Sequence, residues 1–174
     1  MPTYINLNGL GSSGKTTFGG LLQERLRAKN KSCFTLHLAD PVKKICHILT
    51  NEPIINFYTN KKVEMCDNHS LTRRQLMEQV TAKMMEIDDA FFWKLGISEL
   101  YSDVDFVIIC DARYQSWYAY LEEKNIKHKD IYILSDGEVI NNSFDVYYIN
   151  NNKDVISDLE LVADDFLKSN YFNS

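Results

Sequence analysis

The feature that most constrains this chain is a glycine-rich segment near its start, at positions 9–16. Its sequence, Gly-Leu-Gly-Ser-Ser-Gly-Lys-Thr, matches the pattern GxxxxGK[ST] at every fixed position. Glycines let successive backbone N–H groups turn inward, so such a loop forms a nest for phosphate oxygens. The segment follows a strand-like stretch at 4–8, in which Ile5 and Leu7 alternate with the polar Asn6 and Asn8, and it precedes a helical period over 15–28. This strand–loop–helix context indicates a phosphate-binding loop (P-loop) rather than a chance Gly/Ser turn.

The spacing within this loop predicts roles for individual side chains. We expect Lys15 to reach the β- and γ-phosphates of ATP and to act in catalysis, and we expect the Thr16 hydroxyl to bind Mg²⁺. The positive N-terminal end of the following helix adds to the attraction for phosphate. The predicted ATP site consists of Gly11, Ser12, Ser13, Gly14, Lys15, Thr16 and Thr17.

Strand-like and helix-like segments alternate along the chain. Apolar runs typical of strands lie at 4–8, 32–38, 103–110, 130–134 and 146–149, and helical periods separate or follow them. This alternation predicts an α/β fold with a parallel sheet. The segment 51–100 differs, because it contains helix and loop but no clear strand. We interpret it as an inserted helical segment within a single domain, which suits a chain of 174 residues.

Composition excludes several classes of function. The net charge is −5, from 19 Lys and Arg against 24 Asp and Glu, which argues against non-specific electrostatic binding of nucleic acid. No basic leader and no long apolar stretch is present, so we expect neither a signal peptide nor a membrane span. The four cysteines show no CxxC spacing. We therefore expect buried thiols in a reducing cytoplasm rather than a metal site.

An aspartate and an arginine follow the most apolar predicted strand. Asp111 comes directly after the run at 103–110, and Arg113 stands two residues later. In a P-loop fold this position suits a Mg²⁺ ligand, so Asp111 is predicted to bind the metal together with Thr16. A guanidinium at the same edge of the sheet can hold phosphate bidentately, so Arg113 is predicted to bind substrate and to act in catalysis. Alternatively, Arg113 is a surface residue that pairs with Asp111 or Glu122.

Two adjacent arginines stand at the start of another predicted helix. Thr72 and Gln75 have the spacing of a capping box, which places Arg73 and Arg74 in the first turn. The helix dipole disfavours cations there, so an anionic ligand such as an acceptor phosphate would account for them. We predict that both arginines bind the substrate. The alternative is that both are solvated and pair with acids such as Glu78.

A further candidate segment, Leu-Ala-Asp-Pro-Val-Lys-Lys at 38–44, follows the second predicted strand. Asp40 is predicted to act in catalysis and in substrate binding, either by accepting a hydrogen bond from a sugar hydroxyl or by acting on a Mg²⁺-bound water. Lys43 or Lys44 is predicted to face the charge of the acceptor, and Lys43 is the substrate-binding candidate. Alternatively, Asp40 simply caps the next helix, which is a common use of aspartate before proline.

Taken in this order, these segments resemble the deoxynucleoside monophosphate kinases of bacteriophages. The resemblance covers most of the chain. It rests on the P-loop, on Leu38-Ala39-Asp40-Pro41 with Lys43, on Thr72-Arg73-Arg74-Gln75-Leu76, on 87–93 and on Asp111-Ala112-Arg113-Tyr114. Because very many proteins share the P-loop, it is the Ala-Asp-Pro and Asp-x-Arg-aromatic segments that distinguish this family from other P-loop proteins.

The resemblance implies a P-loop NTPase fold of three α/β/α layers, with a parallel five-stranded sheet and an inserted helical segment at 51–100 that binds the nucleoside monophosphate. It implies transfer of the γ-phosphoryl group of ATP, with Mg²⁺, to this small-molecule nucleotide, and functional roles for Asp40, Arg74, Asp111 and Arg113. It also makes a homodimer plausible. The expected location is the cytoplasm, which is the host cytoplasm if a phage encodes the chain.

The chain departs from the family in its arginines. Arg73 stands where the family usually has proline, and no arginine follows Arg113. Kinases of this class commonly clamp the transferring phosphoryl group with lid arginines, and such a clamp contributes about 10³-fold or more in rate. Lys124, Lys127 and Lys129 would replace it only partly, because an ammonium group lacks the bidentate fork.

Two other functions stay open at the level of sequence. One is another small P-loop kinase with a nucleoside or dephospho-coenzyme A as acceptor. An unphosphorylated acceptor would leave Arg73 and Arg74 without an obvious partner, so we rank it second. The other is a non-catalytic, nucleotide-dependent regulatory module, which the lack of lid arginines favours. A guanine-specific switch would need Asn-Lys-x-Asp, whereas 60–63 is Asn-Lys-Lys-Val.

Overall fold

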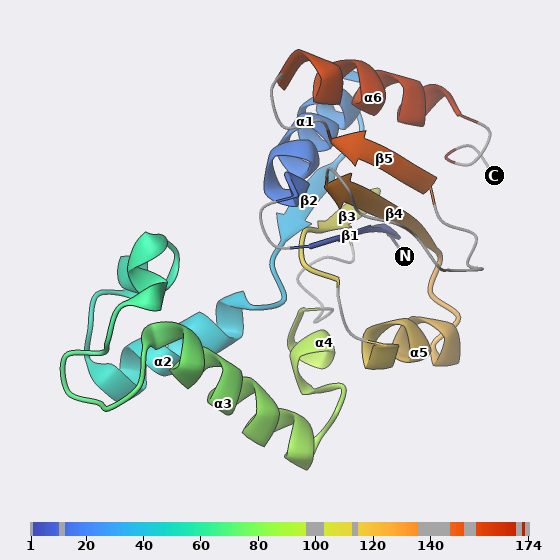
Figure 1. The fold of residues 1–174 in the computed structure, drawn as a ribbon. Helices are drawn as coiled ribbons and strands as arrows, with labels where there is room; N and C mark the ends of the chain where they lie inside the picture. Colours follow the sequence, from blue (N-terminus) through green and yellow to red (C-terminus); the bar gives the residue numbers. More distant parts are fainter. Residues whose placement is uncertain are drawn as a thin grey trace. The chain divides into compact units, whose positions relative to one another are not determined.

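The computed structural model describes residues 2–10, 13–96, 103–112, 115–135, 147–151, 156–169 and 172. The internal contacts divide the chain into two compact units. Unit 1 comprises Met1–His37 and Ile97–Ser174, and unit 2 comprises Leu38–Gly96. Each unit has its own arrangement of elements (Figure 1).

Unit 1 is built on a single parallel sheet. Its strands are β1 (Thr3–Asn8), β2 (Cys33–Leu36), β3 (Phe106–Ile109), β4 (His128–Ser135) and β5 (Tyr147–Asn151). They lie in the order β2-β3-β1-β4-β5, and every neighbouring pair is parallel. The α/β class with a parallel sheet is therefore confirmed. Because β1 is central, the loop that follows it lies at the middle of the carboxyl edge of the sheet.

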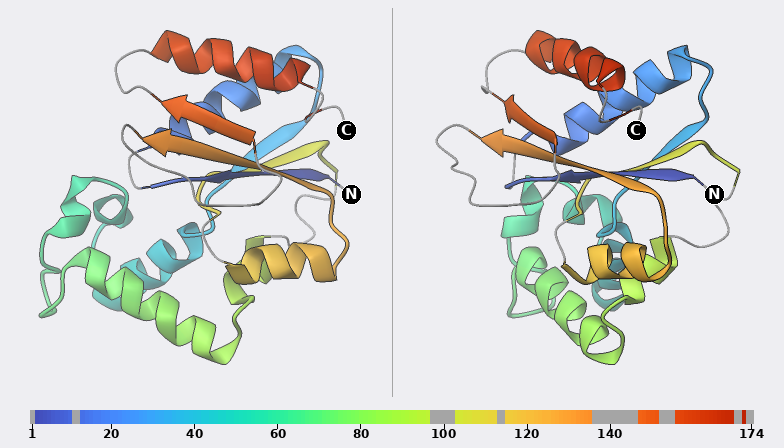
Figure 2. Two further views of the ribbon diagram at one scale, coloured as in Figure 1. Left: turned by 45° about the vertical axis from the view of Figure 1, so that its right-hand side comes forward. Right: turned by 90° about the vertical axis from the view of Figure 1, so that its right-hand side faces the viewer.

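Helices cover both faces of this sheet. The helices α1 (Lys15–Ala28) and α6 (Ile156–Lys168) lie side by side on one face, and α5 (Gln115–Glu123) lies on the other (Figures 1 and 2). The core between the sheet and the first pair of helices is aliphatic and aromatic. It includes Ile5, Leu7, Phe18, Leu22, Ile108, Ile131, Ile133, Ala163 and Phe166, which are all fully buried.

A buried polar residue interrupts the apolar pattern of the central strand. Asn6 is fully buried on β1. Its Nδ2 donates to Asp130 Oδ1 at 2.7 Å, and its Oδ1 accepts from Trp117 Nε1 at 3.0 Å. Burial raises the pKa of the Asp130 carboxyl, although Asn6 and the nearby His128 oppose that rise. The amide of Asn6 thus joins β1, β4 and α5, which explains a polar side chain that sequence periodicity alone cannot account for.

Unit 2 is helical. It contains α2 (Asp40–Thr50), the 3₁₀ helices η1 (Ile54–Phe57) and η2 (Asn60–Val63), α3 (Arg73–Ile87) and α4 (Phe91–Gly96). The helices α2 and α3 pack against each other. For that reason the unit begins at Leu38, earlier in the chain than the inserted segment predicted at 51–100. The two 3₁₀ helices lie in the polar stretch that shows no regular sequence period.

Local sequence signals fix the starts of both long helices in unit 2. Pro41 occupies the first turn of α2, where a backbone N–H has no hydrogen-bond acceptor within the helix, so the missing N–H of proline costs nothing. Thr72 and Gln75 form a complete capping box at the start of α3: Thr72 Oγ1 accepts from the Gln75 N–H at 3.2 Å, and Gln75 Oε1 accepts from the Thr72 N–H at 2.9 Å. The predicted capping box is therefore confirmed.

Two further properties bear on the sequence expectations. The four cysteines, Cys33, Cys46, Cys66 and Cys110, are all buried and none forms a disulfide. Among the residues that the structure describes, none of the helices has the length and the apolar character needed to cross a bilayer.

Candidate nucleotide and acceptor sites

At two positions of the P-loop in unit 1, Gly9 and Gly14, the backbone has a conformation that only glycine adopts readily. Gly9 follows β1 with φ of 130°, and a Cβ there would lie 2.3 Å from the carbonyl oxygen of Ile133. Gly14 has φ of 90° and is the N-cap residue of α1. Both angles belong to the region that L side chains avoid. The loop therefore approaches β4 closely and then turns directly into the helix.

Lys15 folds back into this loop. It is 6% exposed, and its Nζ donates to Gly9 O at 2.8 Å, to Ser13 Oγ at 3.1 Å and also to Leu10 O. These oxygens are neutral acceptors. A phosphate oxyanion forms a shorter and stronger charge-assisted hydrogen bond with an ammonium group than a carbonyl does. The ammonium is thus held at the loop by bonds that a phosphate group can replace.

The beginning of α1 supplies the other groups that a nucleotide and Mg²⁺ require. Thr16 and Thr17 are exposed in the first turn, and the helix runs for 14 residues behind them. Exposed backbone N–H groups and a hydroxyl at a helix N-terminus suit phosphate and a hard cation. Gly11 and Ser12 lie outside the described residues. Those P-loop residues that are described fit ATP and Mg²⁺.

Asp111 stands at the same edge of the sheet as the P-loop. It follows β3, which pairs with β1 in register Asn6↔Ile109, so both strands end toward that edge. The side chain of Asp111 is partly buried. Parallel strands bring their carboxyl ends together, and this is where ligands bind in open α/β sheets. Thr16 and Asp111 therefore remain the predicted Mg²⁺ ligands, whereas Arg113 lies outside the described residues.

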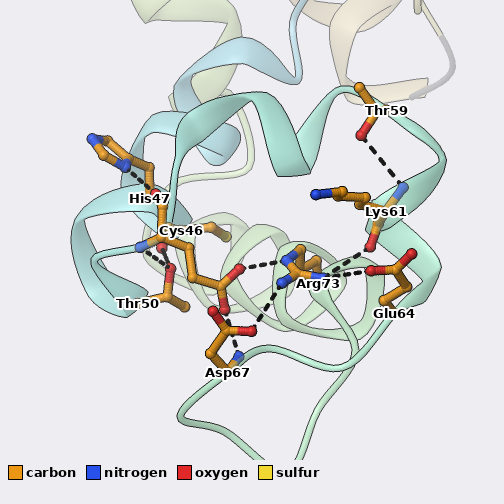
Figure 3. Close-up of polar contacts among 9 residues, drawn as sticks. Cys46, His47, Thr50, Thr59, Lys61, Glu64, Asp67 and Arg73 are labelled. Carbon is orange, nitrogen blue, oxygen red and sulfur yellow. Dashed lines mark hydrogen bonds and ion pairs between the residues drawn. The ribbon is translucent and has the colours of Figure 1, made fainter.

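In unit 2, Arg73 is enclosed by acceptors from its own unit (Figure 3). It is 3% exposed and forms an ion pair with Glu52, which is also 3% exposed. Its other contacts are the carbonyl oxygen of Lys61 at 3.1 Å, Asp67 at 3.4 Å and Glu64 at 3.7 Å. The guanidinium joins the turn after α2, the 3₁₀ helix η2 and the start of α3.

The carboxylate of Glu52 is stabilised in its charged form despite its burial. Burial by itself raises the pKa of Glu52, but the Asp67 N–H and the Arg73 guanidinium outweigh it and hold the pKa below its ordinary value. The Asp67 N–H donates to Glu52 Oε1 at 2.7 Å. Glu52 and Arg73 thus form a buried, hydrogen-bonded ion pair, and removal of the Arg73 charge leaves the Glu52 carboxylate buried without its cation.

These contacts change the interpretation of the arginine pair. A substrate phosphate would have to displace a buried carboxylate from Arg73, so we assign that side chain to the folding of unit 2 and no longer to the substrate. Arg74 is exposed and has no hydrogen bond or ion pair with any residue that the structure describes. Of the two arginines, only Arg74 therefore remains a candidate for binding an acceptor phosphate.

Asp40 makes side-chain contacts that differ from those of a helix cap. The N-cap of α2 is Ala39, and no side chain caps the helix, so the capping alternative for Asp40 is wrong. Asp40 Oδ1 instead accepts from Lys43 Nζ at 3.0 Å and from Tyr58 OH at 2.9 Å. Lys43 thus donates to Asp40, and its contact with the charge of the acceptor stays a prediction.

Sequence patterns gave no indication of two of these residues. Tyr58 is 18 positions from Asp40, and Glu52 is 21 positions from Arg73, so no helical or strand period connects either pair. An isolated acid in a polar stretch is normally a solvated surface residue. By contrast, Asn6 was visible as a polar residue inside an apolar strand.

Comparison with known proteins gives a likeness of overall fold only. No protein-family model matches the chain, and no curated protein is significantly similar to it. A variant of the APS kinase CysC of Mycobacterium tuberculosis is 13% identical over 97% of this chain and 98% of that chain, with a TM-score of 0.46. A sugar kinase from Janibacter sp. HTCC2649 is 12% identical over 99% and 98%, with a TM-score of 0.45. A gluconokinase from Sinorhizobium meliloti 1021 is 12% identical over 99% and 98%, with a TM-score of 0.42. Likenesses at this level carry no information about the substrate.

Proposed function

We propose that this chain is a small phosphotransferase that moves the γ-phosphoryl group of ATP to a deoxynucleoside monophosphate. The observation that carries the proposal is the geometry of the P-loop. Gly9 and Gly14 hold backbone angles that only glycine tolerates, and Lys15 is held at the loop by neutral oxygens that phosphate can replace. The sequence resemblance to phage kinases supplies the acceptor class.

In this proposal unit 1 binds ATP and unit 2 binds the acceptor. Lys15 contacts the β- and γ-phosphates, and Thr16 and Asp111 hold Mg²⁺, which when bound neutralises charge on the phosphates. Asp40 accepts a hydrogen bond from a sugar hydroxyl of the acceptor, and Arg74 holds its phosphate, assisted by Arg113. Positioning and charge neutralisation supply nearly all of the catalysis in such a reaction.

A second candidate is a P-loop kinase whose acceptor carries no phosphate, such as a nucleoside or dephospho-coenzyme A. One observation favours it. Besides the resemblance to phage kinases, the pair Arg73 and Arg74 was a reason to expect a phosphorylated acceptor, and the ion pair of Arg73 with Glu52 removes one of these two arginines. The exposed guanidinium of Arg74 still favours the monophosphate, so the second candidate ranks below the first.

A substrate panel tests these functions. The protein is incubated with ATP, Mg²⁺ and, separately, each ribo- and deoxynucleoside monophosphate, each nucleoside and dephospho-coenzyme A, and ADP formation is followed. ADP formed only with particular deoxynucleoside monophosphates supports the proposal and identifies the base. ADP formed only with an unphosphorylated acceptor replaces it by the second candidate. Measurable ATP binding with no acceptor-dependent ADP indicates a regulatory module instead.

A further inference from the structure

Three side chains of unit 2 form a compact cluster around Asp40. Lys43 lies one turn further along α2, and Tyr58 follows the 3₁₀ helix η1. Tyr58 OH and Lys43 Nζ both donate to the same carboxylate oxygen of Asp40, at 2.9 and 3.0 Å. The Lys43 ammonium also lies 3.9 Å from the centre of the Tyr58 ring. Each member of the cluster thus contacts both of the others.

The cluster leaves one oxygen of Asp40 open to a ligand. Both donors are on Oδ1, and Oδ2 receives no hydrogen bond from any residue within the described part of the chain. The Asp40 side chain is 31% exposed, while that of Lys43 is 15% exposed. A molecule in solvent can therefore reach the carboxylate, although the ammonium that orients it is largely covered.

The phenol of Tyr58 is a permanent donor under physiological conditions. Partial burial and the hydrogen bond to Asp40 raise the pKa of Tyr58 to about 12. The hydroxyl therefore keeps its proton at neutral pH and cannot turn into an acceptor that repels the carboxylate. Two donors and a cation–π contact fix the plane of the Asp40 carboxylate better than one flexible surface ion pair would.

We propose that Tyr58 is a positioning residue for the acceptor site: with Lys43 it fixes Asp40 so that Oδ2 accepts a hydrogen bond from a sugar hydroxyl of the acceptor. This inference rests on the proposed phosphotransferase function and extends it to a residue that no sequence motif contains. A carboxylate held in one orientation before binding loses less freedom when the hydroxyl arrives, so acceptor affinity benefits.

The test is the substitution Tyr58→Phe, which keeps the ring under Lys43 and removes only the hydroxyl. We expect the KM for the acceptor to rise about fivefold, the scale of one lost hydrogen bond, while the KM for ATP stays unchanged. Tyr120→Phe is the matched control, because the Tyr120 ring stacks on Trp117 and its hydroxyl has no hydrogen bond with a described residue. Thermal unfolding of each variant verifies that the protein is folded.

A double-variant cycle separates positioning from a merely structural effect. If Tyr58 acts through Asp40, then Tyr58→Phe has no further effect on acceptor KM in an Asp40→Asn background. Additive effects in the cycle, or an unchanged acceptor KM for Tyr58→Phe in an active enzyme, overturn the positioning role alone. A wild-type protein that phosphorylates no monophosphate and no nucleoside overturns both this inference and the proposed function.

Discussion

Lys15 in unit 1 and Arg73 in unit 2 are both cations that the sequence predicts to bind phosphate, and both are almost fully buried. Their acceptors differ. Lys15 donates to two backbone carbonyls and one hydroxyl, all of them neutral, whereas Arg73 is paired with the buried carboxylate of Glu52. A phosphate that replaces these three neutral acceptors of Lys15 leaves no charge unpaired. A phosphate cannot replace Glu52 at Arg73 without leaving that carboxylate buried and unpaired, which costs several kcal/mol.

This difference shows that a cation in a phosphate-binding pattern is not sufficient evidence of a phosphate site. The charge of the group that already holds the cation decides whether the cation is available. By this criterion the three neutral acceptors of Lys15 do not prevent a phosphate from binding it, whereas Arg73 is part of the framework of unit 2. The same substitution at the two positions should therefore affect different properties of the protein.

The largest expected effect is on activity, from Lys15→Met. Methionine has a similar length but no charge, so it cannot stabilise the transferring phosphoryl group. We expect kcat/KM to fall by about 10²- to 10³-fold in the assay of ADP formation. Unfolding by urea should change less than it does for the corresponding Arg73 variant. A Lys15→Met protein that keeps its rate would show that the P-loop lysine has no role in transfer.

The second effect is on stability, from Arg73→Met. Loss of the guanidinium leaves Glu52 buried and charged, so unit 2 should lose about 3 kcal/mol of unfolding free energy. Urea unfolding, together with hydrogen exchange of the amides of 38–96, measures it. Lys83→Met on the same helix is the control, because its ion pair with Glu86 is exposed and should matter little.

Two outcomes of that experiment sharpen the comparison. A double variant, Glu52→Gln with Arg73→Met, removes both charges and should recover part of the lost stability. If instead Arg73→Met unfolds at the same urea concentration as the wild type but binds the acceptor poorly, the original substrate-binding role of Arg73 is restored.

A smaller effect is expected from Arg74→Ala. This exposed side chain is the remaining candidate in unit 2 for holding an acceptor phosphate. Loss of a charged hydrogen bond should raise the acceptor KM about tenfold, with the KM for ATP and the unfolding curve unchanged. Lys83→Ala serves as the control for loss of an exposed positive charge on α3. Equal kinetics of the wild type and Arg74→Ala with every acceptor would exclude this role.

The smallest expected effect is a pH dependence of the unfolding free energy of unit 2, which arises from Glu52. The pKa of Glu52 is lower in the folded state than in the unfolded chain, so its stabilising contribution is present above the unfolded value of about 4.3. That contribution is lost as the pH falls through the folded pKa. Urea unfolding of unit 2 between pH 7 and pH 3 should show this loss, and Glu52→Gln should lack it.

The pH experiment also tests the contrast with the P-loop. The carbonyl and hydroxyl groups that accept from Lys15 do not titrate in this range, whereas the carboxyl group of Glu52 is titratable. A wild type and a Glu52→Gln variant with the same slope of stability against pH would show that Glu52 is not held as a charged group by Arg73.

Sequence reasoning succeeded where the cause of a structure lies within a few residues. The capping box of Thr72 and Gln75 and the position of Pro41 in the first turn of α2 follow from local chemistry. The buried strand before Asp111 follows from an unbroken apolar run. At Asp40 only the alternative of a local helix cap is wrong, because the carboxylate accepts hydrogen bonds from Tyr58 and Lys43 instead.

By itself, the sequence determined the alternation of strands and helices, the parallel α/β class and the position of the glycine-rich loop at the end of β1. Each depends on periodicity or on short-range backbone geometry, which neighbouring residues specify. Only the tertiary structure decided that Arg73 is paired with Glu52 and that Tyr58 donates a hydrogen bond to Asp40. Those partners are distant in sequence, and their pairing depends on how α2, η1 and α3 pack, which no local pattern encodes.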